Sequence, residues 1–86
     1  KVAKDEKIVK LQSEGRLNLT SLVKEYFPGL KNIYLTNDGG NIILTNSSYY
    51  NSKLLTVEPE LRIRTGFKTG QVKITITSGR VKITPV

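Results

Sequence analysis

The 86-residue sequence contains no cysteine, histidine, methionine or tryptophan. These absences exclude disulfide bonds, thiol nucleophiles, zinc sites built from thiolates or imidazoles, and every mechanism that moves a proton on an imidazole. No apolar run approaches the roughly 18 residues that span a bilayer, and no signal-peptide hydrophobic region opens the chain. The seven acidic residues are scattered rather than clustered as metal ligands. We therefore expect no enzymatic activity, cofactor, metal ion, small-molecule substrate or transmembrane segment, and the compartment stays open.

The residues that are present suit a small globular protein. Hydrophobic residues make up 37% of the chain and charged residues 24%, a balance between that of disordered segments and that of membrane proteins. Chains of this length rarely divide into two cores, so we expect a single domain over residues 1–86, helical over 1–30 and antiparallel β over 31–86. Because the sequence opens with Lys1 rather than methionine, we expect a processed product or a piece of something longer.

The first 15 residues carry a short pattern typical of a helix. Ile8, Val9 and Leu11 form an apolar stripe among charged residues. Gly15 suits the end of a helix, because glycine readily adopts the left-handed conformation found there. The pattern predicts a first helix between Val2 and Gly15.

A second helical pattern follows at once. Its apolar residues recur at the spacing of one helical face: Leu19, Leu22, Val23, Tyr26 and Phe27. Asn18 or Thr20 can cap the start, and Pro28-Gly29 ends the pattern. About nine residues are too few for a helix that is stable alone, so we expect this one to pack on a sheet.

The remainder of the chain reads as strands. If Asp38-Gly39 forms a two-residue turn, residues 32–45 make a hairpin that puts Leu35 opposite Ile42 and Ile33 opposite Leu44. Further strands are expected at Leu54 to Val57, which Pro59 ends or confines to an edge, and at Leu61 to Arg64. Either Leu54 to Val57 or Leu61 to Thr65 is open to a neighbouring strand by β-augmentation.

The strongest pattern is in residues 71–86, two strands around Ser78-Gly79. With that turn, Ile76 faces Val81 and Ile74 faces Ile83, while threonine, lysine and arginine occupy the other face. The expected fold is therefore α+β, with one or two short N-terminal helices packed on a five- or six-stranded antiparallel sheet of largely meander order. The predicted core consists of Leu22, Val23, Tyr26, Phe27, Ile33, Leu35, Ile42, Leu44, Ile63, Ile74, Ile76, Val81 and Ile83.

Positive charge is concentrated near the C-terminus. The net charge is +7, and residues 61–86 hold six basic residues and no acid: Arg62, Arg64, Lys68, Lys73, Arg80 and Lys82. All except Lys68 lie out of phase with the apolar residues of their strands, which predicts one solvent-exposed basic face that binds a partner or a polyanion. The alternative is that these charges only solubilise the sheet and protect its edges from aggregation.

Three functions remain open. The first is a non-catalytic structural or binding module of a larger assembly, with a protein partner or its own copies, to which Tyr49 and Tyr50 add a contact surface. The second is a domain that binds nucleic acid or another acidic polymer through the basic face, although residues 61–86 offer only Phe67 for base stacking. The third is a small histidine-free ribonuclease of the bacterial toxin type, which the chain resembles in composition alone.

Residues 18–46 carry a further resemblance of pattern. A short helix followed by a hairpin resembles the helix-and-sheet domains that build rings in secretion machines, and the stalk-like domains of pilus or phage structural proteins. This resemblance implies a structural component, and it favours the first of the three functions.

Overall fold

The described residues form eight strands, one α-helix and one turn of 3₁₀-helix. The computed structural model describes residues 5–47, 52–57, 60–77 and 79–86. Their elements, in chain order, are β1 (Asp5–Lys10), η1 (Ser13–Gly15), β2 (Arg16–Asn18), α1 (Thr20–Tyr26), β3 (Asn32–Asp38), β4 (Asn41–Thr45), β5 (Lys53–Thr56), β6 (Arg62–Arg64), β7 (Gln71–Thr77) and β8 (Arg80–Pro85).

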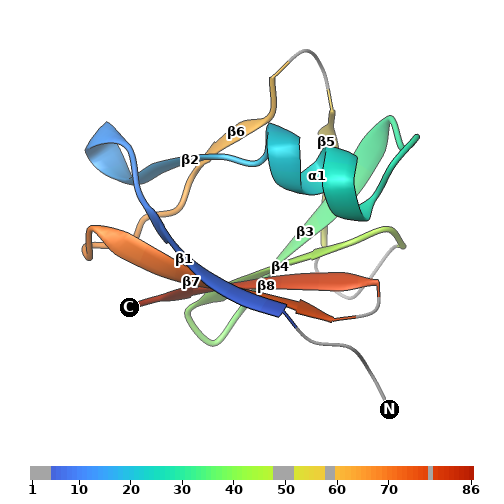
Figure 1. Ribbon diagram of the computed structural model, residues 1–86. Coiled ribbons are helices and arrows are strands. Elements are labelled where there is room, and N and C mark those ends of the chain that lie inside the picture. Colours follow the sequence, from blue (N-terminus) through green and yellow to red (C-terminus); the bar gives the residue numbers. More distant parts are fainter. Residues whose placement is uncertain (1–4, 48–51, 58–59, 78) are drawn as a thin grey trace.

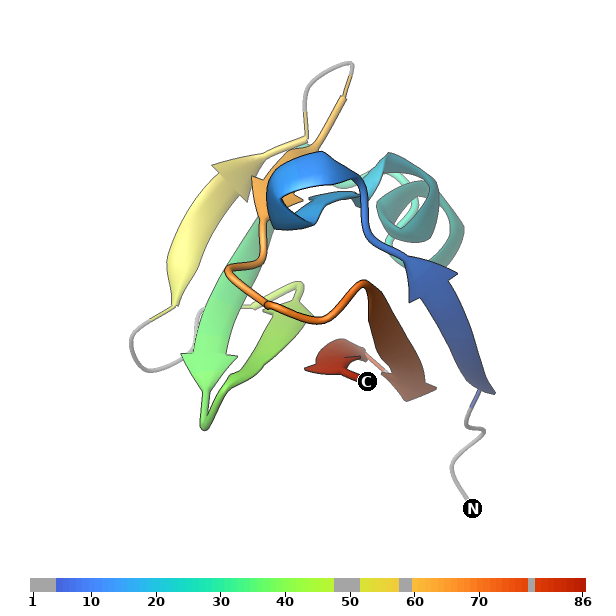
Figure 2. The same cartoon turned by 90° about the vertical axis from the view of Figure 1, so that its left-hand side faces the viewer.

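Six strands pair in the order β1-β7-β8-β4-β3-β5, and all neighbours are antiparallel. The other two, β2 and β6, form a separate antiparallel ribbon. Figure 1 shows this ribbon and α1 lying across one side of the large sheet. In Figure 2 the sheet curves in an arc from β5 to β1 beneath them. The predicted α+β class is confirmed.

The predicted order of strands is wrong in part. Only β3–β4 and β7–β8 are neighbours both in sequence and in the sheet, so the sheet is two hairpins joined through β4 and β8, with β1 and β5 added at the outside. The remaining strands are placed by contacts between distant parts of the chain. A meander is therefore not formed.

The first predicted helix is also wrong, because residues 5–10 form an edge strand. Asp5 lies opposite Ile76 and Lys10 opposite Gln71, so β1 completes the hydrogen bonds of β7. Ile8, the centre of the supposed apolar stripe, is 60% exposed. Gly15 ends no α-helix but is the last residue of the 3₁₀ turn between β1 and β2, with φ of +70°, and the Thr65 N–H donates to its carbonyl oxygen. Long-range pairing has overridden the weak helical pattern.

The second predicted helix is confirmed as α1. The side-chain oxygen Oδ1 of Asn18 accepts a hydrogen bond of 2.9 Å from the Thr20 N–H at its start. At its end the Phe27 N–H donates to the Val23 carbonyl oxygen, and Gly29 has φ of +82°. The apolar face is buried on the sheet, as a helix of seven residues requires.

The hairpin of residues 71–86 is confirmed, whereas that of residues 32–45 has a different turn. In β7 and β8, Ile76 lies opposite Val81 as predicted. In β3 and β4, Asp38 pairs with Asn41, which leaves the two glycines between them as the turn. Gly39 and Gly40 both have positive φ, the conformation that both central residues of a type I′ turn need. The predicted pairs are therefore wrong, because Leu35 lies opposite Leu44 rather than Ile42. The apolar residues still share one face, since the register is shifted by two residues.

The core lies between the large sheet, α1 and the ribbon. It contains Leu17, Leu19, Leu22, Val23, Phe27, Ile33, Ile42, Leu44, Leu61, Val72, Ile74, Ile76, Val81 and Ile83. Ten of the thirteen predicted core residues are among these, and Tyr26, Leu35 and Ile63 are only partly buried against them. The prediction missed Leu17, Leu19, Leu61 and Val72. The burial of Leu17 and Leu61 depends on where the ribbon lies.

A hydrogen bond ties the start of α1 to the chain that enters β6. The Leu61 N–H donates to Oγ1 of Thr20 at 2.8 Å, and the Leu19 N–H donates to the Leu61 carbonyl oxygen at 2.7 Å. Leu61 is buried, so an unpaired N–H there is costly. We expect Thr20→Val to lower the free energy of unfolding by about 1–3 kcal/mol in urea denaturation. Thr20→Ser keeps the hydroxyl and is the matched control, so equal stability of the two variants would contradict this role.

Candidate functional site

The basic residues predicted to share one face lie on two separate surfaces. Lys73, Arg80 and Lys82 are on the outer face of the large sheet, whereas Arg62 and Arg64 are on β6 in the ribbon. Lys68 lies in the exposed loop between β6 and β7. The prediction of a single basic face is therefore wrong. The predicted phase within each strand was correct, since the five strand residues are exposed. The single face fails because β6 pairs with β2 rather than joining the large sheet.

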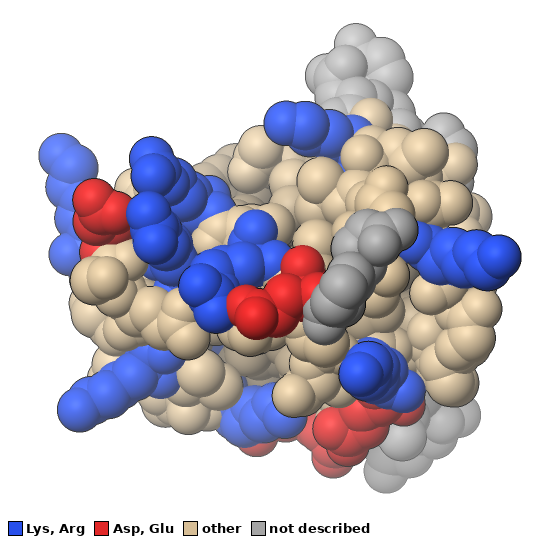
Figure 3. All heavy atoms as spheres, turned by 90° about the horizontal axis from the view of Figure 1, so that it is seen from above, with Lys and Arg blue, Asp and Glu red and all other residues tan. Residues whose placement is uncertain are grey.

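The ribbon carries both signs of charge. Arg16 lies directly opposite Arg64, and the next pair on the same face of the ribbon joins Asn18 to Arg62. Two of these guanidinium groups are neutralised nearby, because Arg16 Nη2 is 3.0 Å from Glu14 Oε1 and Arg62 forms an ion pair with Glu60. Figure 3 looks onto this side of the molecule and shows carboxylates beside the basic groups. The ribbon is consequently not a surface of one sign.

The outer face of the large sheet is rich in threonine and holds separated cations. Lys82 lies between Thr75 on β7 and Ile43 on β4. Lys73 Nζ lies 3.6 Å from Glu6 Oε2 on β1, so a carboxylate stands beside this cation. Of the aromatic side chains in the described strands, only Tyr34 is on this face. Such a face has charge for a polyanion but, among the described strands, a single aromatic side chain on which bases can stack.

Tyr49 and Tyr50, the other predicted contact residues, lie outside the described residues. No group of three or more acidic side chains among the residues described here could hold a metal ion. No helix in the same residues is long and apolar enough to cross a membrane.

The two outer strands of the large sheet differ in chemistry. β1, whose sequence is Asp-Glu-Lys-Ile-Val-Lys, has four charged residues in six, and Asp5 and Lys7 lie on the same face as the core residues that they pair with. Charges at such positions prevent a further strand from pairing. β5, whose sequence is Lys-Leu-Leu-Thr, has one charge, and its Leu54 is 54% exposed. Only β5 has the composition of an edge that can accept another strand.

The free hydrogen-bonding groups of β5 follow from its ladder. The Val57 N–H donates to the Lys31 carbonyl oxygen at 2.8 Å, and the register continues with Leu55 opposite Ile33. In an antiparallel ladder, alternate residues direct their N–H and C=O groups to the same neighbour. Those of Leu55 and Val57 therefore point to β3, and those of Leu54 and Thr56 point away from it. No described strand pairs with that outer side.

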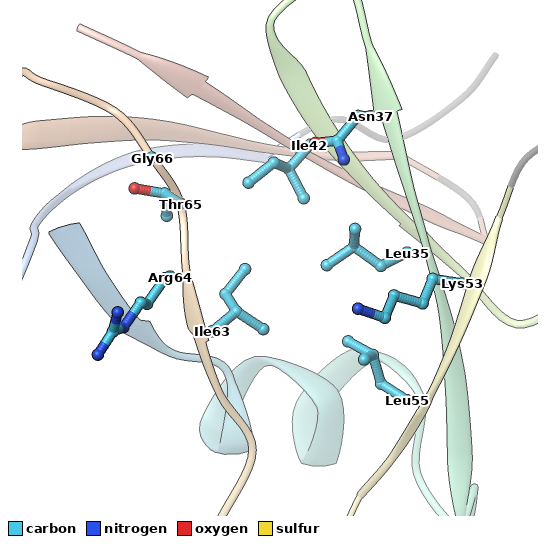
Figure 4. Close-up of a pocket in the computed structure, with 9 residues that line it drawn as sticks. All are labelled: Leu35, Asn37, Ile42, Lys53, Leu55, Ile63, Arg64, Thr65 and Gly66. Carbon is cyan, nitrogen blue, oxygen red and sulfur yellow. The ribbon is translucent and has the colours of Figure 1, made fainter.

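A pocket of about 480 Å³ lies beside this free edge, between β5 and β6. Its walls come from β3, β4, β5, β6 and the residues after β6: Leu35, Asn37, Ile42, Lys53, Leu55, Ile63, Arg64, Thr65 and Gly66. Figure 4 shows the side chains of Leu35, Ile42, Leu55 and Ile63 pointing into it, with the Lys53 side chain reaching in and that of Arg64 turned away. The sequence signal for the pocket was weak, since Leu35 and Ile63 were expected in the core. The strand Leu54 to Val57 was expected to accept a neighbouring strand, but neither Lys53 nor the pocket was predicted as part of a site.

The free edge of β5, Lys53–Thr56, and the adjoining pocket are the candidate functional site. Hydrogen-bonding groups, an exposed leucine and an apolar hollow with one cation meet there, which is the combination that binds an extended peptide. The chain was compared with known protein families, with curated proteins and with solved structures, and none of the three comparisons finds a match.

Proposed function

We propose that this protein is a non-catalytic binding module that accepts an extended segment of a protein partner along the free edge of β5. The difference between the two outer strands of the sheet carries the proposal. A strand added at β5 meets the outward N–H and C=O groups of Leu54 and Thr56, whereas one added at β1 meets four charged side chains. The edge suits both a different protein and a second copy of this chain.

The chemistry of the described residues gives little support to the ribonuclease alternative. Such an enzyme without histidine needs an activated tyrosine, lysine or carboxylate near a bound phosphate. Partial burial is the main cause that raises the pKa of the Tyr26 hydroxyl above its ordinary value, and the negative charge of Glu25 is the second. This phenol is therefore neutral at physiological pH and is not activated as a base. The division of the basic residues between two surfaces likewise weakens the polyanion alternative.

A proline substitution tests the edge. The Thr56 N–H points away from β3, so Thr56→Pro removes a free-edge donor while keeping the β3–β5 ladder. We expect peptides selected from a random phage-displayed library on the wild-type chain to bind Thr56→Pro at least about 10-fold more weakly, as loss of a main-chain hydrogen bond and a steric block imply. Fluorescence anisotropy with labelled peptides measures the change.

Two controls locate the effect. Thr56→Val keeps the N–H and is expected to bind like the wild type. Ile8→Pro removes one outward N–H from β1 instead, because the Leu11 N–H donates to the Gly70 oxygen and alternate residues point outward. Equal loss of binding in Ile8→Pro and Thr56→Pro, or no loss in either, would overturn the proposal.

Amide hydrogen exchange gives a second, independent measurement. On addition of a selected peptide, the amides of Leu54 and Thr56 are expected to gain protection, while that of Leu55 is already protected by its bond to β3. Binding that protects the outer face around Lys82 instead, and that is competed by heparin, would favour the polyanion alternative.

A further inference from the structure

We infer that the segment bound at β5 carries an apolar residue and an acidic residue two positions apart, the first filling the pocket and the second pairing with Lys53. This inference rests on the proposed function and names the chemistry of its partner. Three observations support it: the side chains of Lys53 and Leu55 face the pocket, the pocket wall is largely apolar, and the Lys53 ammonium group reaches into it.

Side-chain alternation along β5 sets the spacing. Lys53 lies opposite Leu35 and Leu55 opposite Ile33, so both point to the core side of the sheet, and both line the pocket. A strand added to the free edge has its own core-side residues beside Lys53 and Leu55, which are two positions apart. Its intervening residue faces outward beside Leu54. One segment therefore addresses both positions with alternate side chains.

The position beside Leu55 favours an apolar side chain. Leu35, Leu55 and Ile63 are only partly buried, whereas Ile33 and Leu44 on the same face are completely buried at 0% exposure. These three partly buried side chains all line the pocket, and Figure 4 shows them converging on the same space. An apolar side chain placed there removes this surface from water, which is the main source of affinity.

The position beside Lys53 favours a carboxylate. The ammonium group of Lys53 reaches into the pocket, and none of the described residues that line the pocket is acidic. Lys53 is also in no ion pair given by the described residues. A carboxylate at this position of the partner forms an ion pair with the Lys53 ammonium group, whereas a lysine there places two cations side by side. The net charge of +7 further favours an acidic partner.

Antiparallel addition, the arrangement of every pair in this sheet, sets the order of the two residues. The residue beside Leu55 then precedes the one beside Lys53 in the partner. The probe is a fluorescein-labelled, threonine-rich octapeptide with a central leucine-threonine-glutamate sequence. Matched peptides replace the glutamate by lysine, or the leucine by alanine.

Charge exchange at Lys53 tests the pairing. We expect the wild-type chain to bind the glutamate peptide roughly 5-fold or more tighter than the lysine peptide, as a partly exposed ion pair implies. Lys53→Glu is expected to reverse that preference. Lys82→Glu changes the net charge equally on the outer face and is expected to keep it, which separates pairing from overall charge. The alanine peptide is expected to bind about 10-fold more weakly than the leucine peptide in all three chains.

The outcomes separate this inference from the function on which it rests. In one outcome Thr56→Pro abolishes peptide binding, yet the binding shows no preference for glutamate, or shows the same preference in Lys53→Glu and Lys82→Glu. Either result contradicts the inference and leaves the edge of β5 as the binding site. Binding unaffected by Thr56→Pro contradicts the proposed function itself. Dimers of the chain that form through β5 and exclude every peptide would show that a second copy occupies the edge, and would also overturn the inference.

Discussion

Replacement of Ile74 by alanine is expected to lower the free energy of unfolding by about 2–5 kcal/mol, measured by urea denaturation. Ile74 is in the middle of β7, opposite Lys7 on one side and Ile83 on the other, and its side chain is 1% exposed. Truncation of this side chain leaves a cavity. β7 cannot move to close it, because the strand is hydrogen-bonded to β1 on one side and to β8 on the other. Since small domains are stable by about 5–15 kcal/mol, this loss removes much of the margin.

The neighbouring residue is the matched control. Thr75 faces the outer side of the sheet between Glu6 and Lys82, where it is only partly buried. We expect Thr75→Ala to cost less than about 1 kcal/mol, the span of strand propensity. A larger loss in Thr75→Ala than in Ile74→Ala would mean that the two faces of β7 are assigned the wrong way round.

Phe27→Ala is expected to cost about 3–5 kcal/mol in the same measurement. Phe27 ends α1, is 5% exposed and belongs to the buried cluster, so its ring is part of the contact between the helix and the sheet. A helix of seven residues has little stability of its own, and its packing must hold it in place. Loss of the ring is therefore expected to weaken the helix and the core together.

Lys24→Ala is the control for this prediction. Lys24 lies on the exposed side of the same helix, and its replacement by a good helix former is expected to change the free energy of unfolding by less than about 0.5 kcal/mol. A Phe27→Ala variant as stable as Lys24→Ala would show that α1 is not packed on the sheet.

The elements that could be predicted are those whose signals are local. The hairpin of β7 and β8 was predicted down to the pairing of Ile76 with Val81, because its turn and its alternation lie within 16 neighbouring residues. Helix α1 was predicted for the same reason. The turn at Gly39-Gly40 was misplaced by one residue, since Asp-Gly and Gly-Gly are both good type I′ sequences and local pattern does not choose between them.

The strand at Leu54 to Val57 was expected, but the rest of the candidate site was beyond the reach of local pattern. Lys53 and Leu55 become a site only because β5 is left at the end of the sheet, and Ile63 becomes a pocket wall only because β6 pairs with β2. Each of those pairings joins segments far apart in sequence. The basic residues show the same limit, because their phase was predictable and their division between two surfaces was not.

The sequence alone therefore determined the class of fold, the helix α1, the hairpin of β7 and β8, and most of the core. Only the tertiary structure decided that residues 5–10 form a strand, that Arg62 and Arg64 leave the sheet for a ribbon, and that β5 remains open beside an apolar pocket. The physical reason is that a strand's partner is chosen by the whole sheet. The N–H and C=O groups of a strand need hydrogen-bond partners, and its apolar face needs burial. The segment that supplies both can come from anywhere in the chain.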